Sequence, residues 1–144
     1  MELDKLDKVA LLARSRESEA ASGLHRSQQA FNQSSAKLSQ LEQFKHEYEQ
    51  RLAALASEGM DARQLADYRR FLGKLSSAIS QQDQEVSRSG SELASSRDTL
   101  VDRSVKRSSV DELINRGRAE LALRDSKREQ RAADESSLRR HTQD

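Results

Sequence analysis

The sequence predicts an all-α protein, a long antiparallel two-helix coiled coil with a frayed C-terminal tail. Three observations support this fold class: a composition rich in helix-forming polar residues, two arrays of apolar residues spaced by seven, and a single turn between them. Of the 144 residues, 34% are charged and 34% hydrophobic. That is too little apolar material for a layered core, so the chain must bury a narrow stripe or remain disordered. The absence of proline argues against disorder.

The first array occupies the N-terminal part of the chain in one unbroken seven-residue frame. Twelve of its sixteen positions are apolar or aromatic. A period of 3.5 residues held over this length is typical of a coiled coil, because an ordinary amphipathic helix drifts out of such a frame. The positions in two parallel series are Leu3, Ala10, Glu17, Leu24, Phe31, Leu38, Lys45 and Leu52, and Leu6, Ala13, Ala20, Ser27, Ser34, Leu41, Tyr48 and Leu55.

The frame breaks at residues 57–61, which read Ser-Glu-Gly-Met-Asp. Gly59 can take the left-handed conformation that ends a helix. Asp61 can cap the following helix by accepting hydrogen bonds from its free N–H groups. A turn this short forces the two helices to run antiparallel.

The second array follows directly, and eight of the nine positions in its main series are large and apolar. Its companion series is apolar near the turn and mostly polar from Gln82 onward. We therefore expect the helices to pack most tightly around the turn and more loosely beyond Gln82. The main series is Leu65, Leu72, Ile79, Val86, Leu93, Leu100, Arg107, Ile114 and Leu121, and the companion series is Tyr68, Leu75, Gln82, Ser89, Ser96, Arg103 and Val110.

The whole chain, residues 1–144, is interpreted as a single coiled-coil hairpin. We expect the first helix over about residues 3–56, the turn over about 57–61, the second helix over about 62–125, and a polar tail over about 126–144. Folding about Gly59 leaves the end of the second helix without a partner in the chain. This segment either frays or becomes ordered in the groove of a partner.

No catalytic or metal-binding constellation is recognisable, so the sequence predicts a protein that is not an enzyme and has no cofactor. The three histidines, His25, His46 and His141, lack a second ligand at a spacing that closes a metal site. Gly73 and Lys74 do not form a phosphate-binding loop, because the upstream glycine and the following Ser or Thr are missing. The charge of +1 with interspersed signs argues against nucleic-acid binding. Without a signal sequence or membrane span, we expect a cytoplasmic protein.

Four of the five aromatic residues flank the turn: Phe44, Tyr48, Tyr68 and Phe71. Tyr48 and Tyr68 fall on the seven-residue series and are interpreted as core residues. Phe44 and Phe71 lie off these series, where a two-helix coil leaves side chains partly exposed. They either widen the packing near the turn or form a binding patch for a partner.

Two segments around the turn resemble the flagellar FliJ family. Residues 40–52 read Gln-Leu-Glu-Gln-Phe-Lys-His-Glu-Tyr-Glu-Gln-Arg-Leu, and residues 68–79 read Tyr-Arg-Arg-Phe-Leu-Gly-Lys-Leu-Ser-Ser-Ala-Ile. The resemblance implies a component of the flagellar type III export machinery. It further implies that the coiled coil docks as a stalk in the ring of the export ATPase FliI, with its regulator FliH, and binds the export gate protein FlhA. It also implies escorting of the export chaperones FlgN and FliT.

The resemblance also assigns residues to these contacts. The gate-binding surface carries over to Leu41, Phe44, Tyr48, Phe71, Leu75 and Ala78. Gln82 and Lys37 depart from the family pattern at the edge of this surface. For the ATPase ring, the family uses the end of the rod that holds both termini, where we nominate Arg116, Arg118 and Arg124. The family further implies peripheral association with the export apparatus of the inner membrane.

Two other functions remain open for a helical binding module of this kind. A substrate-specific secretion chaperone would bind one cargo tightly and ignore the ATPase ring. A purely structural coiled-coil tether would dimerise and show no dependence on the aromatic residues near the turn.

Overall fold

Two helices make up the computed structural model, which describes residues 2–143. Helix α1 spans Glu2–Glu58 and helix α2 spans Ala62–Gln143, and the described residues form no strand. The predicted all-α hairpin is therefore confirmed. The observed helix ends at the turn lie within two residues of the boundaries expected from the heptad frame.

The turn between the helices has the geometry that its residues predict. Gly59 has φ 95°, the left-handed conformation that ends α1. Its N–H donates to the carbonyl of Ala56 at 3.4 Å. Asp61 caps α2, because its Oδ1 accepts a hydrogen bond of 2.8 Å from the backbone N–H of Gln64.

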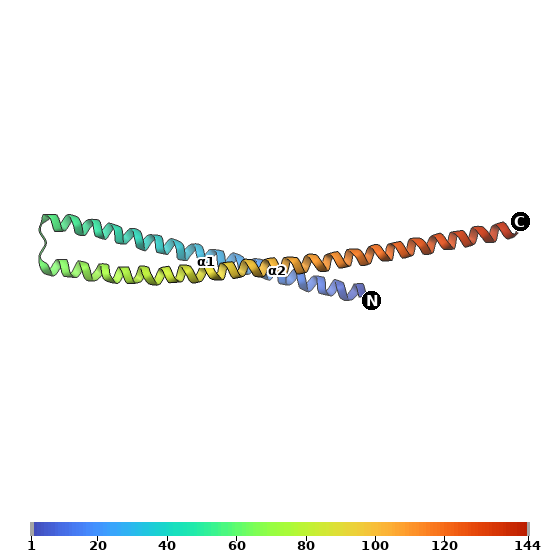
Figure 1. Cartoon of the computed structure of the whole chain (residues 1–144), viewed down its shortest axis with the longest axis horizontal. Helices are drawn as coiled ribbons and strands as arrows, with labels where there is room; N and C mark the ends of the chain where they lie inside the picture. The colour runs from blue at the N-terminus through green and yellow to red at the C-terminus, as the bar shows by residue number, and fades with distance from the viewer. Residues whose placement is uncertain (1, 144) are drawn as a thin grey trace. The chain divides into compact units, whose positions relative to one another are not determined.

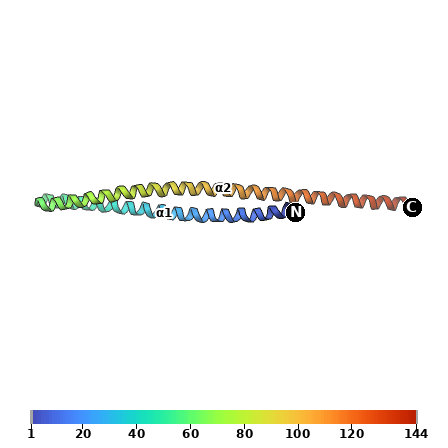
Figure 2. The same ribbon diagram turned by 90° about the horizontal axis from the view of Figure 1, so that it is seen from below.

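The helices pack in two compact units, which we describe separately. One unit is Ala20–Leu100 and contains the turn. The other consists of the remaining described residues, 2–19 and 101–143. In each unit the α1 and α2 segments lie side by side with opposite chain directions (Figures 1 and 2).

The predicted heptad positions are the positions that the structure buries. All sixteen of those in α1 are buried or half-buried, and in α2 the same holds for each one except Leu121. In the unit of residues 2–19 and 101–143, the core is built from Ala10, Val110 and Ile114, with Leu6 packed against them. The heptad frame therefore identifies the contact stripe of both helices.

The prediction that packing loosens beyond Gln82 is wrong. Ser89 is only 2% exposed, and Gln82 and Leu93 are also buried. No residue between positions 41 and 72 is buried to that degree. Small serine side chains let the helices approach closely, and their hydroxyl groups pair across the interface: Ser27 with Ser96 at 2.8 Å and Ser34 with Ser89 at 3.3 Å.

The polar side chain of Gln82 is also accommodated inside this interface. Its Nε2 donates a hydrogen bond of 3.0 Å to the carbonyl of Ser34. A buried polar group destabilises the fold when it lacks a hydrogen-bond partner. Because Gln82 has one, the polar series lowers the stability of the interface little here.

The structure corrects the expected end of the second helix. A polar tail was expected from about residue 126, but α2 continues without a break to Gln143. Every residue with a described side chain beyond Gly117 is exposed. The segment is rich in Ala, Leu, Arg, Lys and Glu and contains no Gly or Pro. These residues favour a helix by their intrinsic propensity even where no packing supports it.

Candidate protein-binding surfaces

The four aromatic side chains that flank the turn form one continuous cluster within the unit Ala20–Leu100. The ring centroids of Tyr48 and Phe71 are 4.6 Å apart, and those of Phe44 and Tyr48 are 4.9 Å apart. Phe44 meets Phe71 edge to face at 6.3 Å, and Tyr68 lies 6.3 Å from Tyr48. These separations are those of favourable aromatic pairs. Residues from both helices therefore build a single aromatic cluster.

Two side chains of the cluster are half-buried between the helices and the other two are exposed to solvent. Tyr48 and Tyr68 are half-buried, as their heptad positions predict. Phe44 is 44% exposed and Phe71 is 37% exposed. Large aromatic surface held rigidly in water is typical of residues that a partner covers.

Arg51, on α1, places a positive charge beside the aromatic cluster. The guanidinium carbon of Arg51 lies 5.6 Å from the centroid of the Tyr48 ring. This is within the range of a cation–π contact. Arg51 is not among the residues that the family resemblance assigns to the gate surface, although its position three residues after Tyr48 on the same helix face is the signal that identifies it.

The other residues nominated for the gate surface divide between surface and core. Leu41 and Ala78 are half-buried, next to the aromatic cluster in sequence. Leu75 is only 7% exposed. A side chain this deeply buried presents little area to a partner.

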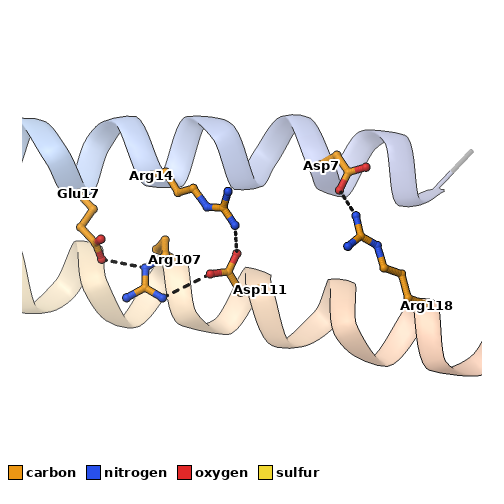
Figure 3. A network of polar contacts seen from close by, with 6 residues as sticks. All are labelled: Asp7, Arg14, Glu17, Arg107, Asp111 and Arg118. Carbon is orange, nitrogen blue, oxygen red and sulfur yellow. Dashed lines mark hydrogen bonds and ion pairs between the residues drawn. The ribbon is translucent and has the colours of Figure 1, made fainter.

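The unit of residues 2–19 and 101–143 carries a different surface, dominated by ion pairs between the helices. Arg107 Nε donates to Glu17 Oε2 at 3.0 Å, and its Nη1 lies 3.3 Å from Asp111 Oδ2. Arg14 binds the second oxygen of Asp111 at 3.4 Å. Figure 3 shows these contacts as one chain of charges that joins α1 to α2. The two carboxylates raise the pKa of Arg107, chiefly through the hydrogen bond that Arg107 donates to Glu17.

The arginines nominated for the ATPase contact lie in this same unit, but they are not equivalent. Arg118 makes an ion pair with Asp7 at 3.4 Å, visible in Figure 3. Arg116 pairs with Glu112 one turn earlier on α2 at 2.7 Å. Arg124 lines a hollow next to Leu6 and Leu121. Two of the three are thus engaged within the chain.

The described residues provide no site for a metal ion, since no group of three or more His, Cys, Asp or Glu side chains among them could hold one. Neither described helix is long and apolar enough to cross a membrane.

Comparison with known families gives one match. The family model described as "Flagellar FliJ protein" matches residues 1–144, the whole chain. The chain belongs to the FliJ family. No curated protein matches the sequence. No solved structure matches it either.

Membership of the FliJ family makes this chain a component of flagellar protein export. The match confirms the resemblance found in the two segments around the turn and extends it to the full length.

Proposed function

We propose that this FliJ protein is a non-enzymatic link between the export ATPase and the export gate. One end binds as a stalk in the FliI ring, alongside the regulator FliH. The aromatic cluster near the turn binds the gate protein FlhA. The same chain escorts the chaperones FlgN and FliT, and it works in the cytoplasm at the periphery of the inner-membrane export apparatus.

The exposed part of the aromatic cluster is the observation that carries the gate contact. Phe44 and Phe71 are the only large hydrophobic residues exposed in the unit Ala20–Leu100. Their rings are fixed against Tyr48, so a partner would lose little side-chain entropy in ordering them. A rigid aromatic anchor of this kind typically contributes about 1–3 kcal/mol to binding.

The test is titration of the cytoplasmic domain of FlhA with the wild-type chain and with Phe44→Ala and Phe71→Ala. We expect each substitution to raise Kd about 5- to 150-fold, the equivalent of roughly 1–3 kcal/mol. Phe31→Ala is the matched control. Phe31 is half-buried and packs against Gly90, away from the cluster, so its loss lowers stability without removing the binding surface.

Two outcomes would count against the gate contact. Equal affinity for the wild type and Phe71→Ala would remove the cluster from the binding surface. If Phe71→Ala unfolds the hairpin while Phe31→Ala does not, Phe71 serves the fold. Circular dichroism of each variant at the binding temperature separates these cases.

The stalk contact is tested by light-scattering chromatography of the chain with FliI, with and without a non-hydrolysable nucleotide. We expect a species with about one copy of the chain per ATPase hexamer. Failure to co-elute under both conditions would remove the stalk function. In that case, tight binding of a single cargo would favour a secretion chaperone, and self-association alone would favour a tether.

A further inference from the structure

The two flanks of the interface between α1 and α2 differ in charge within the unit of residues 2–19 and 101–143. On one flank, acidic and basic side chains pair across the helices: Asp7 with Arg118, and Arg14 with Asp111 (Figure 3). Paired charges of this kind specify how the two helices align. The other flank lacks this complementarity.

The register of the helices determines which residues of α1 face which residues of α2 on that second flank. Leu3 packs against Gly117, where an added Cβ would lie 3.0 Å from Leu3 Cδ2, and Glu17 binds Arg107. Positions 9 and 16 of α1 therefore lie across from about positions 113 and 106 of α2. These four positions hold Val9, Arg16, Leu113 and Lys106.

Two cations thus face each other at Arg16 and Lys106. A third, Arg103, lines the same shallow hollow of about 40 Å³, whose apolar lining includes Val9 and Leu12. The ion pairs of the described residues include none of these three cations. Glu19 and Asp102 lie within one helical turn of them but make no ion pair there. Since like charges repel, this flank lacks the attraction between opposite charges that joins the helices on the other flank.

Apolar surface lies directly beside the cations. Val9, Leu12 and Leu113 are each about half exposed, although they sit next to the core of Ala10 and Val110. We call the surface of Val9, Leu12, Arg16, Arg103, Lys106 and Leu113 the cationic groove. It combines a hollow that fits the tip of one aliphatic side chain with three positive charges that lack a partner.

We propose that the cationic groove docks an acidic amphipathic segment of the export ATPase, one that offers aliphatic side chains flanked by carboxylates. Charge complementarity identifies this occupant, because carboxylates would neutralise the facing cations and the aliphatic groups would cover Val9 and Leu12. The inference rests on the proposed stalk function. It assigns the contact to the groove and moves it away from Arg116 and Arg118, whose charges are already paired within the chain.

The opposition of Arg16 and Lys106 provides a test that separates binding from folding. The single variants Arg16→Glu and Lys106→Glu each turn a repulsive pair into an attractive one. We expect the melting temperature of the free chain to stay equal or rise in both. We expect the affinity for the cognate FliI to fall at least about tenfold, because the acidic segment then meets a like charge. Arg26→Glu, an exposed cation in the other unit, is the charge-matched control and should change affinity less than about twofold.

Each outcome of this experiment supports or overturns the assignment of the ATPase contact to the cationic groove. If the wild type binds FliI and both groove variants bind equally well, the groove is not the contact and only this inference fails. If the wild type does not bind at all, the stalk function itself is wrong, and the groove assignment falls with it. If either variant changes the oligomeric state of the free chain in light scattering, the groove is an interface between copies of this chain. Loss of affinity accompanied by a lower melting temperature would also overturn the proposal.

Discussion

Two glycines with equally open surroundings should respond in opposite ways to alanine. Gly73 lies inside α2, and Gly59 ends α1 with φ 95°. A Cβ added at either position would meet nothing within 4 Å. New side-chain packing therefore contributes nothing at either site. The backbone conformation alone decides whether alanine raises or lowers the free energy of unfolding.

The magnitudes follow from that conformation. Gly73→Ala should stabilise the fold by about 0.5–1 kcal/mol, because alanine loses less entropy in a helix than glycine does. Gly59→Ala should destabilise it by roughly 1–2 kcal/mol, the cost of a left-handed conformation for a residue with a Cβ. For a chain of this length, 1 kcal/mol shifts Tm by about 4 °C.

Thermal unfolding followed by circular dichroism measures both changes. Protein concentration must be kept constant, because any self-association would also shift Tm. A lower Tm for Gly73→Ala would mean that α2 is not a regular helix at this point. A higher Tm for Gly59→Ala would refute the left-handed conformation at the turn.

Three further predictions concern the interface and the end of α2. Ser89→Leu should destabilise the hairpin by about 1–3 kcal/mol in chemical unfolding, because the closely packed serine site has no room for the larger side chain; a gain in stability would show that the helices can separate there. A chain ending at residue 120 should keep the Tm of the full chain, since every described side chain from 121 to 142 is exposed; a drop of several degrees would reveal packing by that segment. Arg88 lowers the pKa of Glu85 from its ordinary value of 4.5, mainly by a side-chain hydrogen bond. Because the pKa of Glu85 is lower in the folded state, its ionised form stabilises the protein at pH values above the pKa of the unfolded state. The wild type should therefore have a higher Tm than Glu85→Gln at pH 7, and this difference should disappear as the pH falls through the pKa of the folded state. A difference in Tm that persists at pH 2 would contradict this.

The aromatic cluster shows how far sequence reasoning reaches at a functional site. Spacing alone separates the half-buried Tyr48 and Tyr68 from the exposed Phe44 and Phe71. It cannot show that Phe71 reaches across to Tyr48, because that contact depends on how the two helices align. It also places Leu75 on the binding surface, although the structure buries this side chain between the helices.

The serine-rich part of the interface shows a second limit. A polar series is ordinarily interpreted as a weak contact, because each position offers little apolar area. Ser27 and Ser34 on one helix meet Ser96 and Ser89 on the other, so their hydroxyl groups satisfy one another. Burial of a polar side chain depends on the partner that it finds, which lies far away in the sequence.

The sequence by itself determined that this chain forms two helices joined at Gly59, and it identified the residues that face the interface. Local propensity, the heptad period and the turn residues are sufficient for this, because each acts over a few neighbouring positions. Only the tertiary structure decided which charges are paired across the helices and which are not. Arg118 and Arg16 look alike in the sequence, but Arg118 faces Asp7 and Arg16 faces Lys106. That difference arises because the alignment of two antiparallel helices brings together residues about a hundred positions apart.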